Sequence, residues 1–268
     1  MNQPEERPRA VSDILESGVR LAAGRALVLL RITASLILPS GVLLGAVIVW
    51  LAMSSGSKHL AFGILVPVTV LYVLALVVAG AACLKVVAEA RTDAEPNAWA
   101  AIAFALRRLV PVLCLTLLLL VGAAPAIAVL VLPIAVALGR YAALLSVFGF
   151  LSLWFSGIFV VAMPAMLLEE KGVVESLRRS AGLVRGRFWR ALGTFLFGGI
   201  IALFAGVIVA IVVSVFRFGD GGNAVLIVSL AGVGLGLLFV APIFVSFLVV
   251  LFDDLRARER DLSAMRAG

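Results

Sequence analysis

The chain has 268 residues, of which 63% are hydrophobic and only 14% charged, and its mean hydropathy is +1.21. Soluble domains are about half apolar and about a quarter charged, so this composition excludes a soluble globular protein and indicates a polytopic membrane protein. The net charge of +7 does not indicate a nucleic-acid partner, because the charges flank apolar runs and suit a membrane surface better.

Uncharged runs of about 20 residues mark spanning helices. Six such spans are predicted: Ile32–Met53, Ala61–Leu84, Leu109–Leu132, Tyr141–Leu168, Ala191–Phe216 and Ala224–Phe252. A transmembrane β-barrel would alternate apolar and polar residues, whereas these runs are continuous and must satisfy their backbone groups as helices. The predicted fold is therefore all-α. We expect one membrane domain over 1–268, with an N-terminal segment at 1–31, a six-span bundle at 32–252 and a tail at 253–268.

The basic residues are distributed unevenly between the two sides of these spans. The N-terminal segment, the second and fourth connections and the C-terminal tail carry 19 of the 22 Lys and Arg residues. The three alternate connections carry one each, namely Lys58, Arg140 and Arg217. Because cytoplasmic loops carry the excess of Lys and Arg, both termini are predicted to be cytoplasmic.

Before each predicted pair of spans lies a stretch whose apolar residues recur at helical spacing. In the last stretch these residues are Val173, Val174, Leu177, Ala181, Val184 and Phe188. In the middle stretch Asn97 is a candidate N-cap of a helix with an apolar face of Trp99, Ile102 and Leu106. The first and third stretches match at an offset of 162 residues, for example at Leu15/Leu177, Gly24/Gly186 and Arg25/Arg187. We predict three repeated units, each an amphipathic interfacial helix, a short basic turn and a helical hairpin.

The fourth connection carries the most distinctive polar residues, Arg178, Arg179, Arg185, Arg187 and Arg190. One interpretation is a binding site for anionic lipid headgroups or for a protein partner on the cytoplasmic face, since arginine forms two-point contacts with phosphate. The other is that these residues only set the orientation of the chain, and the similar bias of the other cytoplasmic segments favours it.

Small residues inside the last two spans suit close helix packing. The candidates are Gly232 and Gly236 in the sixth span and Gly198 and Gly206 in the fifth. The AGVGLG run around Gly232 is not a dinucleotide-binding loop, because that loop needs a preceding strand. No ionisable residue lies deep in a span, which disfavours an ion-coupled transporter.

Residues for catalysis or metal binding do not form a recognisable pattern. His59 is the only histidine, and Cys83 and Cys114 lie apart in apolar runs. Asp253 and Asp254 are placed to pair with Arg256 and Arg258 on a helix that continues beyond the last span. We therefore expect no enzymatic activity, no metal and no cofactor.

Two stretches, ESLRRSAGLVRGRFWRALG at Glu175–Gly193 and LFDDLRARERDL at Leu251–Leu262, resemble a bacterial family named after the membrane domain of glycerophosphoryl diester phosphodiesterases. The shared features are Glu169 and Glu170, Arg179-Ser180, Gly186, Trp189-Arg190, Phe252, and Asp254-Leu255-Arg256-Ala257-Arg258. The resemblance implies a six-span module of the bacterial inner membrane that lacks the separate catalytic domain.

These observations favour a non-enzymatic membrane module, a scaffold or partner subunit whose cytoplasmic basic helices contact anionic lipid or another protein. The alternative is a transporter or channel for a lipid or an uncharged solute, suggested by the repeats and by prolines within the spans. Few and isolated polar residues in the spans favour the module.

Overall fold

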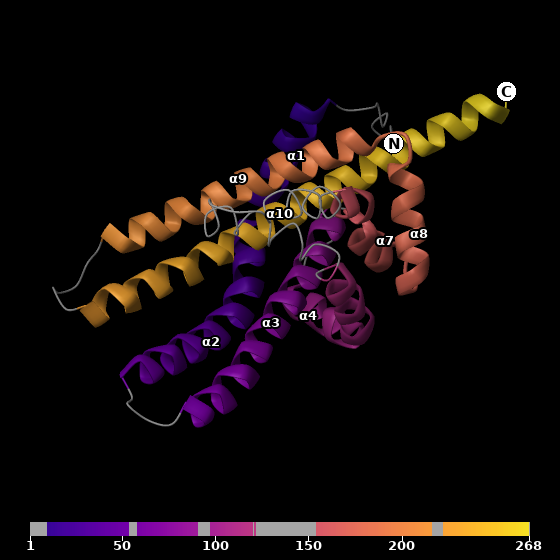
Figure 1. Ribbon diagram of the computed structural model, residues 1–268. Helices are drawn as coiled ribbons and strands as arrows, with labels where there is room; N and C mark the ends of the chain where they lie inside the picture. The colour runs from indigo at the N-terminus through magenta and orange to yellow at the C-terminus, as the bar shows by residue number, and fades with distance from the viewer. Residues whose placement is uncertain are drawn as a thin grey trace, which may run out of the picture. The chain divides into compact units, whose positions relative to one another are not determined.

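The computed structural model describes residues 10–53, 58–90, 97–119, 121, 154–215 and 222–267, and the structural statements below concern these residues. Their helices are α1 (Val11–Gly24), α2 (Ala26–Met53), α3 (Lys58–Glu89), α4 (Ala98–Arg107), α7 (Ala162–Leu168), α8 (Val173–Val184), α9 (Phe188–Val215) and α10 (Gly222–Ala267) (Figure 1). No strand occurs among them, which confirms the all-α fold expected from continuous apolar runs.

Four helical segments are long and apolar enough to cross a membrane, and they make the chain a multi-pass membrane protein. They are Ala26–Leu51, Gly63–Glu89, Phe188–Val209 and Leu238–Met265. A fifth would be the pair Ala98–Arg107 and Leu109–Leu119, which is bent by 74°. The predicted third and fourth spans extend into residues outside the described ranges, so the total of six stays a prediction.

Several helix ends differ from the predicted span boundaries, and the largest differences are in α2 and α10. Helix α2 begins at Ala26, before the predicted span start at Ile32, and therefore includes Arg31. Helix α10 does not stop at Phe252 but continues to Ala267 over 46 residues. At 1.5 Å per residue this is about 69 Å, more than twice the hydrocarbon thickness of a bilayer, so α10 is longer than one crossing requires; we call its residues after Phe252 the α10 extension.

The predicted order of amphipathic helix, basic break and apolar helix occurs three times along the chain. Helix α1 is separated from α2 by Arg25, α4 from the helical residues after it by Arg108, and α8 from α9 by 185–187. The Asn97 side chain accepts the backbone N–H groups of Trp99 and Ala100 at 3.0 and 3.3 Å, which confirms the predicted N-cap of α4. The arrangement of the spans as three hairpins stays a prediction.

The contacts divide the chain into two compact units. Unit 1 comprises Met1–Ser17, Val110–Phe197 and Phe247–Gly268, and unit 2 comprises Gly18–Leu109 and Gly198–Ser246. In unit 2, α2 packs on α3 and α3 on α4, with Ile37, Ala79 and Leu238 buried together.

The predicted packing glycines fall in unit 2, on α9 and α10, which run side by side (Figure 1). A Cβ atom placed on Gly236 would lie 2.5 Å from the carbonyl oxygen of Gly206, and one placed on Gly206 would lie 2.6 Å from Cγ2 of Val240. The two backbones therefore approach so closely that neither position has room for a side chain. Gly198 is buried, and the surroundings of Gly232 lie outside the described residues.

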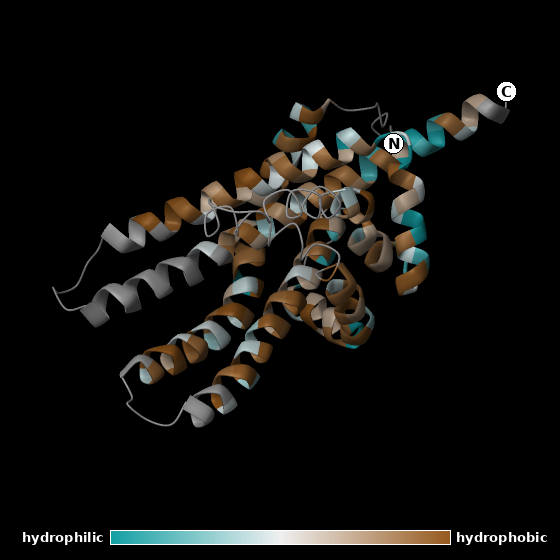
Figure 2. Cartoon of the chain, in the orientation of Figure 1, coloured by the Kyte–Doolittle hydropathy of each residue, from teal (hydrophilic) through white to brown (hydrophobic). Residues whose placement is uncertain are grey.

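Unit 1 contains α7, α8, the start of α9 and the end of α10. Its core includes Met166, Leu183, Leu251, Phe252 and Leu255, all fully buried. Figure 2 shows that hydrophilic residues gather on α8 and on the last turns of α10. The basic cluster predicted from the sequence lies in this unit.

Candidate functional site

Helix α8 is held in place by small and polar residues of the two motif stretches. The Ser180 hydroxyl is buried and donates to the carbonyl oxygen of Ile158 at 2.8 Å. After α8 the chain turns into α9 through Gly186, whose φ of +78° is a conformation that side chains disfavour. A Cβ atom on Gly157 would lie 2.7 Å from the Phe188 ring, so the start of α9 packs directly on this backbone.

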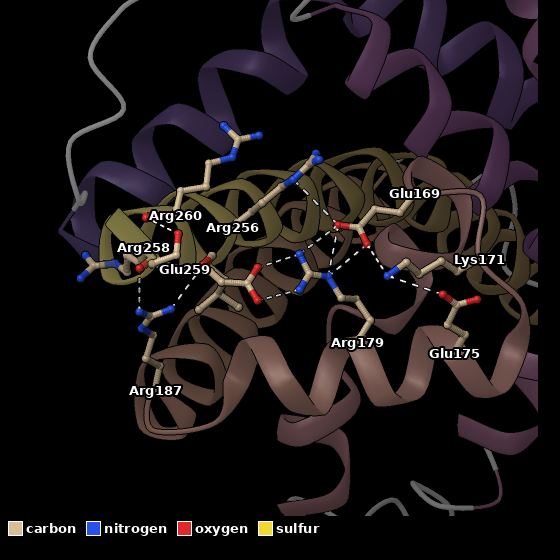
Figure 3. Close-up of polar contacts among 11 residues, drawn as sticks. Glu169, Lys171, Glu175, Arg179, Arg187, Arg256, Arg258, Glu259 and Arg260 are labelled. Carbon is tan, nitrogen blue, oxygen red and sulfur yellow. Dashed lines mark hydrogen bonds and ion pairs between the residues drawn. The ribbon is translucent and has the colours of Figure 1, made fainter. Parts of the chain in front are cut away.

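Arg179 on α8 pairs with two carboxylates that are far apart in the sequence. Its Nε lies 3.0 Å from Oε2 of Glu169, in the turn after α7. Its terminal nitrogens lie 2.7 Å from the two oxygens of Glu259 on α10. Figure 3 shows the guanidinium between the two carboxylates. A planar fork can hold both groups at once, and a lysine cannot.

Glu169 is the carboxylate most enclosed by cations. Its side chain is only 10% exposed, and Lys171 and Arg256 approach it to 3.1 and 3.9 Å in addition to Arg179. Burial raises the pKa of Glu169, but hydrogen bonds from Arg179 and Lys171 and their positive charges outweigh it, so the pKa is lowered. The pKa of Arg179 is raised, chiefly by its hydrogen bond to Glu259 and also by its contacts with Glu169.

Arg187 and Arg190 also bind α10. Arg187 donates to the carbonyl oxygens of Leu255 and Arg258 at 3.3 and 3.0 Å, as Figure 3 shows. Arg190 donates to Asp254 at 3.1 Å, and Arg258 donates to the same carboxylate oxygen at 3.0 Å. The Asp254 side chain is 1% exposed. Since a buried charge is costly unless it is paired, these arginines stabilise the fold.

We call this set the arginine–carboxylate cluster: Glu169, Lys171, Arg179, Arg187, Arg190, Asp254, Arg256, Arg258 and Glu259. It divides the five arginines proposed as one binding surface. Arg179, Arg187 and Arg190 are engaged within the chain, whereas the side chains of Arg178 and Arg185 are exposed and make no hydrogen bond or ion pair with the described residues.

Sequence reasoning missed the acidic partners from other segments. It paired Asp254 with Arg258 by helical spacing, and the structure places their atoms 3.0 Å apart. It did not pair Asp254 with Arg190 or Glu259 with Arg179, because the partners are 64 and 80 residues apart. The available signal was the presence of acidic residues beside the basic ones in both motif stretches.

A family model described as the membrane domain of glycerophosphoryl diester phosphodiesterase matches residues 137–259. This segment, a little under half of the chain, is similar to that membrane domain. The matched range runs from before α7 to Glu259 on α10, and so contains every member of the arginine–carboxylate cluster. No curated protein and no solved structure matches the chain.

The chemistry of the arginine–carboxylate cluster suits mechanical coupling of helices. Glu169 has a lowered pKa and is a poor proton acceptor near neutral pH. Within the described residues, no group of three or more His, Cys, Asp or Glu side chains could hold a metal ion. Three arginines and a buried aspartate instead join α8, α9 and α10 at one end of unit 1.

Proposed function

We propose that the chain is a non-enzymatic membrane module that acts as a scaffold for a protein partner at its cytoplasmic face. The observation that carries this proposal is the double ion pair of Arg179 with Glu169 and Glu259. It ties the amphipathic helix α8 to the α10 extension, and so fixes two helices that a partner can recognise as one surface.

The charges of this region support a binding role more than a chemical one. The arginines of the arginine–carboxylate cluster meet carboxylates or carbonyls, and the lowered pKa of Glu169 keeps it ionised. A rigid pair of helices loses little conformational entropy on binding, which favours recognition by a partner.

The test is purification from native membranes in mild detergent, with mass spectrometry of the proteins that co-purify. Three forms are compared: the unmodified chain, Arg179→Gln and the control Arg107→Gln, which removes an exposed arginine charge from a different helix, α4. We expect a partner to co-purify with the unmodified chain and with the control, and to be depleted at least about tenfold from Arg179→Gln, because that change releases α10 from α8.

Cross-links between the partner and residues of α8 or the α10 extension would support the proposal. Equal recovery of the partner with both variants would contradict it. Translocation of a lipid or uncharged solute by the purified chain in vesicles, with no partner recovered, would favour the transporter alternative.

The cytoplasmic position of α8 is part of the proposal and is tested separately. Reporter fusions at Ser57, Arg140 and Gly221 should report the outside of a bacterial inner membrane, and a fusion at Lys171 the inside. This follows from the asymmetry of basic residues. An outside signal at Lys171 would contradict the proposed orientation.

A further inference from the structure

Helix α8 has a second face that does not contact the described protein. The buried residues of α8 are Ser176, Ser180, Leu183 and Val184. On the other side Val174 is 64% exposed, and Arg178 follows it one helical turn later, also exposed. Arg185 is exposed at the end of the helix, and Trp189, at the start of α9, is 77% exposed. We call Val174, Arg178, Arg185 and Trp189 the exposed α8 face.

The composition of the exposed α8 face does not suit water. A helix on the surface of a soluble protein buries its apolar residues and exposes its polar ones. Here a tryptophan and a valine are exposed beside two arginines. Tryptophan is enriched at the membrane–water interface because one part of its ring is apolar and another donates a hydrogen bond. Arginine binds phosphate through its planar fork.

The position of Trp189 along the chain indicates the same environment. The spanning segment of α9 is Phe188–Val209, so Trp189 is the second residue of a membrane-crossing helix. The first turn of such a helix lies at the level of the lipid headgroups. Arg178 and Arg185 belong to the helix and turn directly before it, within reach of the same layer.

We propose that the exposed α8 face lies in the headgroup layer of the bilayer and binds anionic phospholipid through Arg178 and Arg185. This inference rests on the proposed function only in taking α8 to be at the membrane surface. Charge complementarity selects anionic lipid, because two arginines without an ion pair among the described residues face outward. The division of the basic cluster limits the site to these two arginines, since Arg179, Arg187 and Arg190 hold the fold together.

Helix α4, in unit 2, has the same pattern. Ala101, Ile102 and Ala105 are buried, whereas Trp99 and Leu106 are exposed. The sequence had placed Ile102 on one apolar face with Trp99 and Leu106, and the structure separates them. In each unit, then, an amphipathic helix before an apolar helix packs one face on protein, and an exposed tryptophan lies on that helix (Trp99) or at the start of the apolar helix after it (Trp189), which suits a helix in the headgroup layer.

The test uses the full chain in lipid vesicles with Trp189 as the only tryptophan. The chain has four tryptophans, and Trp50→Phe, Trp99→Phe and Trp154→Phe remove the other three. Vesicles contain phosphatidylcholine and phosphatidylglycerol, and one lipid at a time carries bromine atoms that quench tryptophan fluorescence. Iodide in the buffer quenches tryptophans that face water.

We expect brominated phosphatidylglycerol to quench Trp189 more strongly than brominated phosphatidylcholine, and iodide to quench it weakly. Each basic residue near an anionic surface contributes about fivefold to binding. The double variant Arg178→Gln, Arg185→Gln should therefore weaken the local preference for phosphatidylglycerol by up to about 30-fold. Thermal stability in detergent should be unchanged, because neither arginine side chain makes a hydrogen bond or ion pair with the described residues.

Two controls separate this site from net charge and from fold. Lys58→Gln with Arg217→Gln removes the same charge from two connections predicted to lie on the other side, and should leave the preference unchanged. Arg178→Lys with Arg185→Lys keeps the charge and should keep most of the preference. Strong iodide quenching of Trp189, or an equal preference in the glutamine variant, would overturn the inference. A water-facing Trp189 with a partner still lost from Arg179→Gln would overturn the inference alone and leave the proposed function standing.

Discussion

Arg179 forms two ion pairs, and distance and burial make opposite predictions about which of the two is stronger. Arg179 is closer to Glu259, at 2.7 Å, than to Glu169, at 3.0 Å. The Glu259 side chain is 45% exposed and the Glu169 side chain only 10%. Water screens an exposed pair, which contributes about 0.2–1 kcal/mol. Breaking a buried pair costs about 3–5 kcal/mol, because one charge is left without its partner.

We expect the loss in free energy of unfolding on removing Arg179 to lie between these limits. In Arg179→Gln, Glu169 keeps Lys171 at 3.1 Å and Arg256 at 3.9 Å, so its charge is not left alone. We expect the free energy of unfolding to fall by about 2 kcal/mol. The coupling energy between Arg179 and Glu169 should be about 1.5 kcal/mol, and that between Arg179 and Glu259 about 0.5 kcal/mol.

The assay is a pair of double-mutant cycles on the full chain, with Arg179, Glu169 and Glu259 each replaced by uncharged glutamine. Reversible unfolding of the purified protein by titration with a denaturing detergent in mixed micelles gives the free energies. A coupling to Glu259 equal to or larger than that to Glu169 would refute the argument that burial, and not distance, decides the strength of these pairs.

Three further perturbations test other parts of the structure. The pKa of Glu169 is lowered in the folded state. Its ion pairs therefore stabilise the protein fully above the ordinary pKa of 4.5, and this stabilisation is lost as the pH falls through the lowered pKa. Unfolding measured from pH 6 to pH 3 should show a steeper loss of stability for the native chain than for Glu169→Gln. Gly236→Leu should cost about 3 kcal/mol or more of stability in detergent, since even a Cβ atom would meet the Gly206 carbonyl oxygen at 2.5 Å. The control Gly45→Ala should cost nothing, because no atom lies within 4 Å of the added Cβ. Equal stability of the two variants would contradict the close packing of α9 against α10. Gly186→Ala should lower the melting temperature by the equivalent of about 1 kcal/mol, because its φ of +78° strains any side chain; an unchanged melting temperature would show that the turn relaxes.

Local features of the fold could be predicted from the sequence because they depend on neighbouring residues. Apolar runs predicted the spanning segments, and the N-cap at Asn97 followed from residue type and position. Span ends were less well predicted, since charge alone marked them. Arg31 lies inside α2 and Asp254 inside α10. A charged residue can lie in a helix where it has a partner or is near the helix end, although the charge pattern assigns such a residue to a loop.

The candidate site could be predicted only in its residue types. Five arginines close together in the sequence indicated one basic surface, but the property that separates them is the presence of a carboxylate from a distant segment. Helical spacing gives neighbours three or four residues away, and so it found Asp254 with Arg258. The pairing of Glu259 with Arg179 depends on the packing of α10 against α8, which one sequence does not specify.

The arginines of the basic cluster differ in what their side chains contact, and this bears on both interpretations of the cluster. The asymmetry of Lys and Arg counts charges per loop and makes no distinction between an arginine in an ion pair and one that faces lipid. Arg179 and Arg190 have carboxylate partners, so their contribution to attraction for an anionic leaflet is largely cancelled. The side chains of Arg178 and Arg185 have no such partner among the described residues, so their charge is not cancelled within this part of the chain. An exchange of the whole cluster for lysine would therefore disturb the ion pairs of the fold while keeping the charge of the exposed arginines. Separating the two roles requires variants of Arg178 and Arg185 and variants of Arg179 and Arg190, measured side by side.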